Sequence, residues 1–89
     1  MLFRSARALG AIGPEAKTAV PALIVALKDR NKQVRQDAAY ALGEIGKEAK
    51  AAVPALVEAY KEDDPFIKQR VGIALKKIDP VAASKAGVK

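Results

Sequence analysis

The sequence predicts an all-α fold, a short α-solenoid in which antiparallel helix pairs stack in a row. Residues 8–40 and 41–73 are two copies of one 33-residue unit, with 16 identities between them. Alanine, which has the highest helix propensity, supplies 19 of the 89 residues, whereas the aromatic residues number four. Apolar residues recur at helical spacing in both copies. Each copy is therefore expected to bury its apolar side against its neighbours in the row.

The organisation that follows is one domain over residues 1–89. It divides into a partial repeat at 1–7, full repeats at 8–40 and 41–73, and a partial C-terminal repeat at 74–89. The third copy loses the pattern after Ser84, and Gly87 stands where the helix-opening proline belongs. We therefore expect a natural C-terminus and a truncated or atypical N-terminus.

The first helix of each unit is expected to open at Val20-Pro21 and at Val53-Pro54. Proline suits the first helical turn, where its missing N–H leaves no bond unmade. Polar runs at 28–31 and 61–64 end these helices, and Asn31 and Asp64 are N-cap candidates for the helices that follow. The expected buried positions are Val20, Leu23, Ile24 and Leu27 in one copy and Val53, Leu56, Val57 and Tyr60 in the next.

The second helix of each unit is expected over about 32–45 and 65–78. Gly13 and Gly46 can end such helices in a left-handed conformation, short helical turns are expected at 14–17 and 47–50, and Asp79-Pro80 resembles a cap with a first turn. The predicted buried stripes, at helical spacing, are Val34, Ala38, Ala41, Leu42 and Ile45, and Ile67, Val71, Ala74, Leu75 and Ile78.

Two other repeats of similar length fit less well. Ankyrin units carry Thr-Pro-Leu-His near their start, and this chain has no histidine. A tetratricopeptide register would place Pro54 inside a second helix, where proline breaks the hydrogen-bond ladder.

The segments Val34-Arg35-Gln36-Asp37-Ala38-Ala39-Tyr40-Ala41-Leu42-Gly43-Glu44-Ile45-Gly46 and Ala19 to Asp29 fit another pattern. They resemble the short HEAT-like repeats of the type noted in phycobilin lyases, over nearly the whole chain. The resemblance implies a HEAT/armadillo-like, right-handed α-α superhelix. It implies little about function, because such repeats occur in scaffolds, adaptors, lyase subunits and DNA-repair proteins.

Composition argues against an enzyme. The chain has no cysteine and no histidine, so Ser5, Thr18 and Ser84 have no imidazole to activate them. The acids at 62–64 lack the alternation and turn glycine of a calcium loop, and the glycines at 10, 13, 43 and 46 follow no strand that would make a phosphate cradle. We expect no catalytic residue, no cofactor and no metal site.

Sixteen Lys and Arg against ten Asp and Glu give a net charge of +6. This charge fits either an anionic partner or helix-end electrostatics with solubility, since many of the lysines fall near expected helix C-termini. No stretch approaches the roughly 20 apolar residues of a membrane span, and Met1 to Gly13 lack a signal-peptide layout. We expect a soluble protein without a membrane partner, in the cytoplasm by default.

What remains is the surface of the second helices, which is expected to line the concave side of the stack. The candidate partner-binding ridge is Arg4, Arg7, Gln36, Asp37, Tyr40, Glu44, Gln69, Arg70, Ile73 and Lys77, with Phe3 and Ala11 beside its N-terminal part. A tyrosine flanked by arginines has the composition of an interaction hot spot. The leading hypothesis is a non-catalytic module that binds a protein partner.

Two alternatives remain open. One is a nucleic-acid-binding element that uses the basic ridge, although Asp37 and Glu44 interrupt it and phosphate contacts need several cations. The other is a fragment or subunit of a bilin-lyase-like enzyme. We also expect either self-association through residues 1–27 or a longer array, because an uncapped solenoid end exposes apolar surface.

Overall fold

The computed structural model describes residues 18–62 and 64–89 of the 89-residue chain. These residues form α2 (Val20–Ala26), α3 (Lys32–Ile45), the 3₁₀ helix η2 (Gly46–Ala52), α4 (Val53–Ala59), α5 (Pro65–Ile78) and α6 (Pro80–Lys85). The described ranges contain helices and no strand, which confirms the all-α prediction. The predicted helices at 14–17 and earlier, with the helix end at Gly13, lie outside the described residues.

The helix starts are those that the sequence predicts. Pro21 and Pro54 lie in the first turns of α2 and α4. The Asn31 side chain caps α3 by accepting hydrogen bonds from the backbone N–H groups of Gln33 and Val34, at 2.8 and 3.3 Å. Asp64 caps α5 in the same way. Each capping oxygen satisfies two amide groups that the helix itself leaves without partners.

The helix ends agree with the prediction in part. Gly46 follows α3 with φ at 76°, as expected for a glycine terminator, although its ψ of −139° lies outside the left-handed helical region. The link between α3 and α4 holds more than the single short turn predicted at 47–50, because η2 consists of two short 3₁₀ turns separated by a kink at Ala49, whose φ and ψ are −95° and 19°. Asp79 caps α6 by accepting from the amide of Ala82 at 3.1 Å, which confirms its predicted role.

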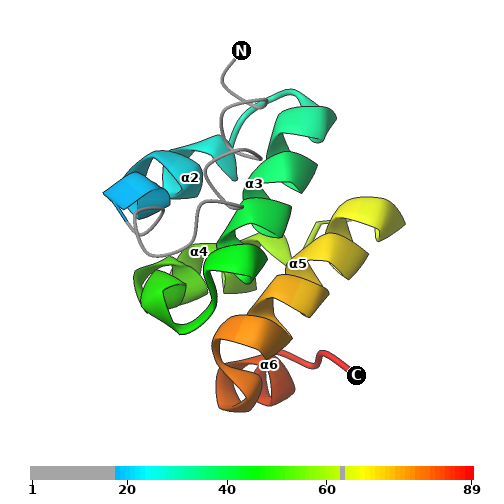
Figure 1. Ribbon diagram of the computed structural model, residues 1–89. Coiled ribbons are helices and arrows are strands. Elements are labelled where there is room, and N and C mark those ends of the chain that lie inside the picture. Colours follow the sequence, from blue (N-terminus) through cyan, green and yellow to red (C-terminus); the bar gives the residue numbers. More distant parts are fainter. Residues whose placement is uncertain (1–17, 63) are drawn as a thin grey trace.

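The helices form two layers (Figure 1). In this view α3 and α5 run side by side, α2 lies to the left of α3, and α4 passes behind α3. α5 is the central element, since it packs against α3, α4, η2 and α6. Within the predicted stripes every residue of α3 and α5 is buried except Ile45, which is half-buried. The core therefore lies between the two layers.

Candidate functional site

The α3–α5 face is the outward side of the two second helices. Ala74 of α5 lies so close to Gly43 of α3 that a Cβ at position 43 would be 3.2 Å from the Ala74 Cα. This close approach brings the outward rows of both helices into one surface. We define the face by Gln36, Tyr40, Glu44, Phe66, Gln69, Arg70, Ile73 and Lys77.

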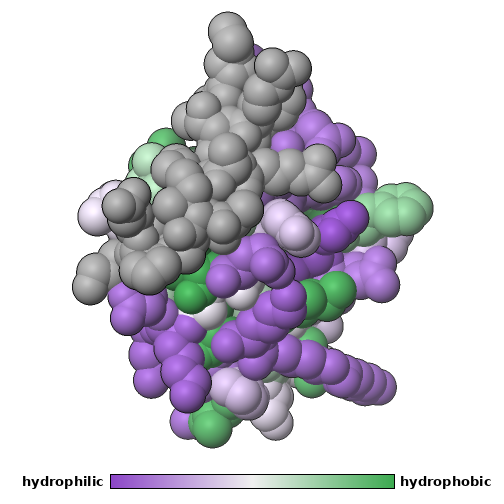
Figure 2. Space-filling view, viewed as in Figure 1, coloured by the Kyte–Doolittle hydropathy of each residue, from purple (hydrophilic) through white to green (hydrophobic). Residues whose placement is uncertain are grey.

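Apolar side chains on this face surround a cationic one. Tyr40, Ile73 and Phe66 are exposed by 38%, 46% and 68%. Gln36 and Gln69 join Phe66, Arg70 and Ile73 around a hollow of about 310 Å³. A narrow groove continues from there between Tyr40 and Lys77. Figure 2 shows this side of the molecule: hydrophilic residues cover most of the described surface, and separate hydrophobic patches lie among them.

The residues of the predicted ridge differ in their exposure, and the ridge as a binding site stays a prediction. Gln36 is half-buried, and the residues exposed as expected are Tyr40, Glu44, Gln69, Arg70, Ile73 and Lys77. Arg4 and Arg7 lie outside the described residues, as do Phe3 and Ala11.

The expectation for Asp37 is wrong, because this side chain is only 5% exposed. Asp37 follows Val34 by three residues and precedes Ala41 by four, so it lies on the buried side of α3. Its carboxylate accepts a hydrogen bond from Gln33 Nε2 at 3.1 Å. Asp37 therefore neither contacts a partner on this face nor interrupts a basic ridge there.

Glu44 and Lys77 hold equivalent positions in consecutive copies, 33 residues apart, and form an ion pair. The Lys77 Nζ lies 2.9 Å from a carboxylate oxygen of Glu44, with both side chains partly exposed. Such pairs are worth at most about 1 kcal/mol. The pair does, however, neutralise one of the two cations that the described part of this face contributes, and Arg70 is the other.

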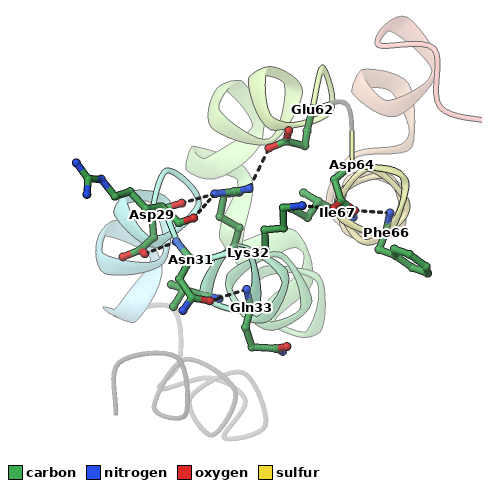
Figure 3. A network of polar contacts seen from close by, with 11 residues as sticks. Asp29, Asn31, Lys32, Gln33, Glu62, Asp64, Phe66 and Ile67 are labelled. Atoms are coloured by element: carbon green, nitrogen blue, oxygen red, sulfur yellow. Dashed lines mark hydrogen bonds and ion pairs between the residues drawn. The ribbon is translucent and has the colours of Figure 1, made fainter.

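A second polar cluster joins the copies at the start of α3 and α5 (Figure 3). The Arg35 guanidinium donates to the backbone oxygens of Asp29 and Arg30 and lies 3.2 Å from a Glu62 carboxylate oxygen. Lys32 reaches Asp64 at 3.1 Å. The acids at 62 and 64 thus serve helix capping and contacts between units, which supports the helix-end interpretation of this run.

Sequence reasoning missed two residues of these surfaces. Phe66 was left out because it precedes the buried stripe, yet Phe66, Arg70, Ile73 and Lys77 follow one another at steps of four, three and four along one side of α5. Arg35 was treated only as part of the repeat pattern. Its role depends on carbonyl groups that α2 places beside α3, and spacing alone does not show them.

The Asp64 carboxylate gives the fold an acid-sensitive point. The Lys32 ammonium donates to it, and the amides of Ile67 and Phe66 do so as well, and together these hydrogen bonds lower the pKa of Asp64 below its usual value. A pKa that is lower in the folded state stabilises the fold above the unfolded-state pKa, and this contribution is lost as the pH falls through the folded-state value.

Replacing Asp64 by asparagine is therefore expected to make stability less dependent on pH below about pH 4. Asparagine keeps the cap, as Asn31 does in α3, but cannot form the ion pair with Lys32. Urea unfolding of both proteins between pH 2 and pH 7, on the order of six points, measures the difference. The prediction fails if the two stability curves run parallel throughout.

The geometry defines a class of protein: a stack of helix pairs that forms a short α-solenoid. The chain matches the family model described as HEAT repeats over residues 3–76. It therefore belongs to the HEAT-repeat family. Members of this family commonly mediate protein interactions and are generally non-catalytic scaffolds.

Searches among curated proteins and among solved structures returned no significant match. The finer resemblance to the phycobilin-lyase type of repeat stays a prediction. Within the described residues, no helix has both the length and the apolar character that crossing a membrane requires.

Proposed function

We propose that the chain is a non-catalytic protein-binding module that holds its partner on the α3–α5 face. The observation that supports this proposal is that three exposed side chains, Tyr40, Phe66 and Ile73, line adjoining hollows that both include Arg70. Exposed aromatic and aliphatic side chains beside an arginine are typical of interaction hot spots, and charged residues are depleted at the centre of such sites. A partner segment that inserts an apolar side chain and offers a carboxylate to Arg70 fits this face best.

The nucleic-acid alternative has less support. The burial of Asp37 removes one of the acids that would oppose a phosphate backbone. Lys77, however, is paired with Glu44, so Arg70 is the one cation that the described part of the face has outside an ion pair. Strong phosphate binding requires several such cations. The bilin-lyase alternative rests on resemblance alone.

Self-association through residues 1–27 also remains a prediction. Residues 18–27 are the described part of this range, and there Val25 of α2 is well exposed. A cytoplasmic location stays part of the proposal as well.

The proposed function predicts that a protein partner recovered from native lysate depends on Tyr40. Replacing Tyr40 by alanine is expected to weaken binding by about 2 kcal/mol, because a central aromatic anchor is lost. The loss should persist in about 0.5 M salt, where exposed charges are screened. Titration calorimetry with the purified partner measures both affinities.

Val81→Ala is the matched control, since Val81 is an exposed side chain of α6 that lines none of the hollows described on α3 and α5. Changing Arg4, Arg7 and Arg70 together to serine tests the electrostatic alternative. If binding depends on charge, this triple variant weakens it steeply at low salt. A partner whose affinity ignores both Tyr40→Ala and the triple variant binds elsewhere, and the proposal is then wrong.

A further inference from the structure

Internal repetition shows which side of α5 would receive another helix. The outer side of α5 is formed by Lys68, Gly72 and Lys76, on the flank turned away from α3. The residues 33 positions earlier are Arg35, Ala39 and Gly43 of α3. That side of α3 is fully occupied by the next copy: Ala39 is buried, Gly43 meets Ala74, and Arg35 pairs with Glu62. The outer side of α5 is thus a helix-docking position by structural equivalence.

A groove of about 420 Å³ runs along this side, with a largely apolar floor and lysines at its edges. Its lining includes Tyr60, Lys68, Gln69, Ile73, Lys76 and Val88. The Lys68 ammonium lies 5.0 Å from the centre of the Tyr60 ring. Lys76 Nζ donates to the backbone oxygen of Lys89.

One wall of the groove is fixed by the end of α6. The Val88 amide donates to the Ala83 oxygen at 2.9 Å and the Gly87 amide to the Ser84 oxygen at 3.1 Å, with φ of Gly87 at 93°. This is a Schellman motif, which ends α6 and directs Val88 onto α5. A Cβ added to Gly72 would be 3.3 Å from the Val88 Cγ1, so Val88 packs closely against the helix and leaves the groove above it open.

The charges along this groove specify an acidic occupant. Between α3 and α5 the pairs are opposite in sign at both ends: Lys32 with Asp64, and Glu44 with Lys77. These pairs join the two N-terminal ends and the two C-terminal ends, so the helices run parallel. On α5 the position of Glu44 is taken by Lys77, that of Arg35 by Lys68, and that of Gly43 by Lys76. Lys77 is already paired with Glu44, so a helix on the outer side of α5 meets the cations of Lys68 and Lys76.

The side of α5 that faces α3 gives the spacing of the partner residues. It presents Ala74 to Gly43 and Lys77 to Glu44, and Arg70 borders the same groove. On α5 these residues are a cation at position 70, a small residue four positions later and a second cation three positions after that. A partner helix that packs on the outer side of α5 in the same way, with acids in place of the two cations, would carry an acid, a small residue and an acid at the same spacing. Asp37, Ala41 and Glu44 of α3 follow this pattern.

We propose that the outer side of α5 is a second interaction surface, which docks an acidic helix of a partner protein parallel to α5. The partner carries acid, small residue and acid at positions i, i+4 and i+7. A second folded copy of this chain does not supply such a helix, because its Asp37 is buried and residues 1–13 contain no acid. A nucleic acid fits less well, because the groove floor of Gly72, Ile73 and Val88 is apolar. This groove shares Gln69 and Ile73 with the α3–α5 face but includes neither Tyr40 nor Arg70.

The test uses a synthetic peptide of residues 31–46 with Lys32→Gln and Arg35→Gln, acetylated and amidated so that Asp37 and Glu44 are its only charged groups. It is added to the ¹⁵N-labelled full chain. We expect saturable shifts of the Lys68, Gly72, Lys76 and Val88 amides, which line the groove but lie outside the α3–α5 face, at peptide concentrations up to about 1 mM. A peptide with Asp37→Lys and Glu44→Lys should bind at least about tenfold more weakly, since two attractions become repulsions.

Charge reversal on the protein should invert this preference. In the Lys68→Glu, Lys76→Glu variant, the lysine-bearing peptide should bind better than the acidic one. Lys47→Glu with Lys50→Glu is the matched control, because it makes the same charge change on exposed lysines of η2 and should preserve the original preference. If the glutamate variant does not fold, Lys68→Gln with Lys76→Gln replaces it and should weaken acidic-peptide binding.

Three outcomes would overturn the proposal. The acidic peptide could fail to bind, its shifts could map to the α3–α5 face, or the two glutamate variants could affect binding equally. A single-stranded oligothymidylate that shifts the same amides more strongly than the acidic peptide would reassign the groove to polyanions. None of these results bears on Tyr40, so failure here is distinguishable from failure of the proposed function.

Discussion

Replacing Leu75 by alanine is expected to lower the free energy of unfolding by about 3 kcal/mol. Leu75 is 0% exposed and lies on α5, which packs against four other elements of the described chain. Truncation removes buried apolar contacts and leaves a cavity that a close-packed interior fills only in part. In a domain of this size the loss is a large fraction of the total stability. Urea unfolding followed by circular dichroism measures it.

Ile73→Ala is the control for Leu75→Ala. Ile73 lies two residues earlier on the same helix but is 46% exposed, so its truncation is expected to lower stability by less than about 1 kcal/mol. The slope of free energy against urea should stay unchanged in both variants. Equal losses at the two positions would show that α5 does not form the core in solution.

Replacing Gly43 by leucine is expected to destabilise the fold by about 3 kcal/mol, because it separates the two second helices. Even the Cβ of a new side chain would lie 3.2 Å from the Ala74 Cα and 3.4 Å from its Cβ. The first of these atoms belongs to the backbone of a packed helix and cannot rotate away. The unfavourable contact outweighs the better helix propensity of leucine, which contributes less than about 1 kcal/mol.

Gly43→Ala separates these two effects. Its single methyl group requires a shift of only a few tenths of an ångström, and alanine gains up to about 1 kcal/mol from helix propensity. We therefore expect a stability change within about 1 kcal/mol of zero. If Gly43→Leu were as stable as Gly43→Ala, the close contact between α3 and α5 would not exist in solution.

The sequence predicted the elements of this fold well because local chemistry determines them. Proline in a first turn and a side-chain oxygen at Asn31 or Asp64 act within three residues of their positions. The buried stripes follow from helical spacing. The two copies of the repeat place apolar residues at equivalent positions, so each copy supports the assignment in the other. The predictions at Gly46 and in the link from 47 to 50 were less accurate. The backbone geometry there depends on how the chain turns from α3 into α4.

The candidate site was less predictable, since exposure depends on which sides of a helix its neighbours cover. Asp37 was predicted to be exposed because only one buried stripe was assigned to α3. The buried residues of α3 also include Ala39 and Gly43, outside that stripe. Phe66 was likewise left out of the predicted site, although it is 68% exposed. A helix packed on several sides has a buried surface wider than a single stripe.

The sequence by itself determined the helical class, the repeat register and the family, because these follow from residue type and spacing along the chain. The tertiary structure alone decided which side chains are exposed. It placed Asp37 in the interior, paired Glu44 with Lys77, and left Phe66 and Ile73 beside Arg70. It also placed Val88 against Gly72, where the groove on the outer side of α5 is formed. The reason is physical: burial and charge pairing are properties of residues distant in the sequence, and only packing brings these together.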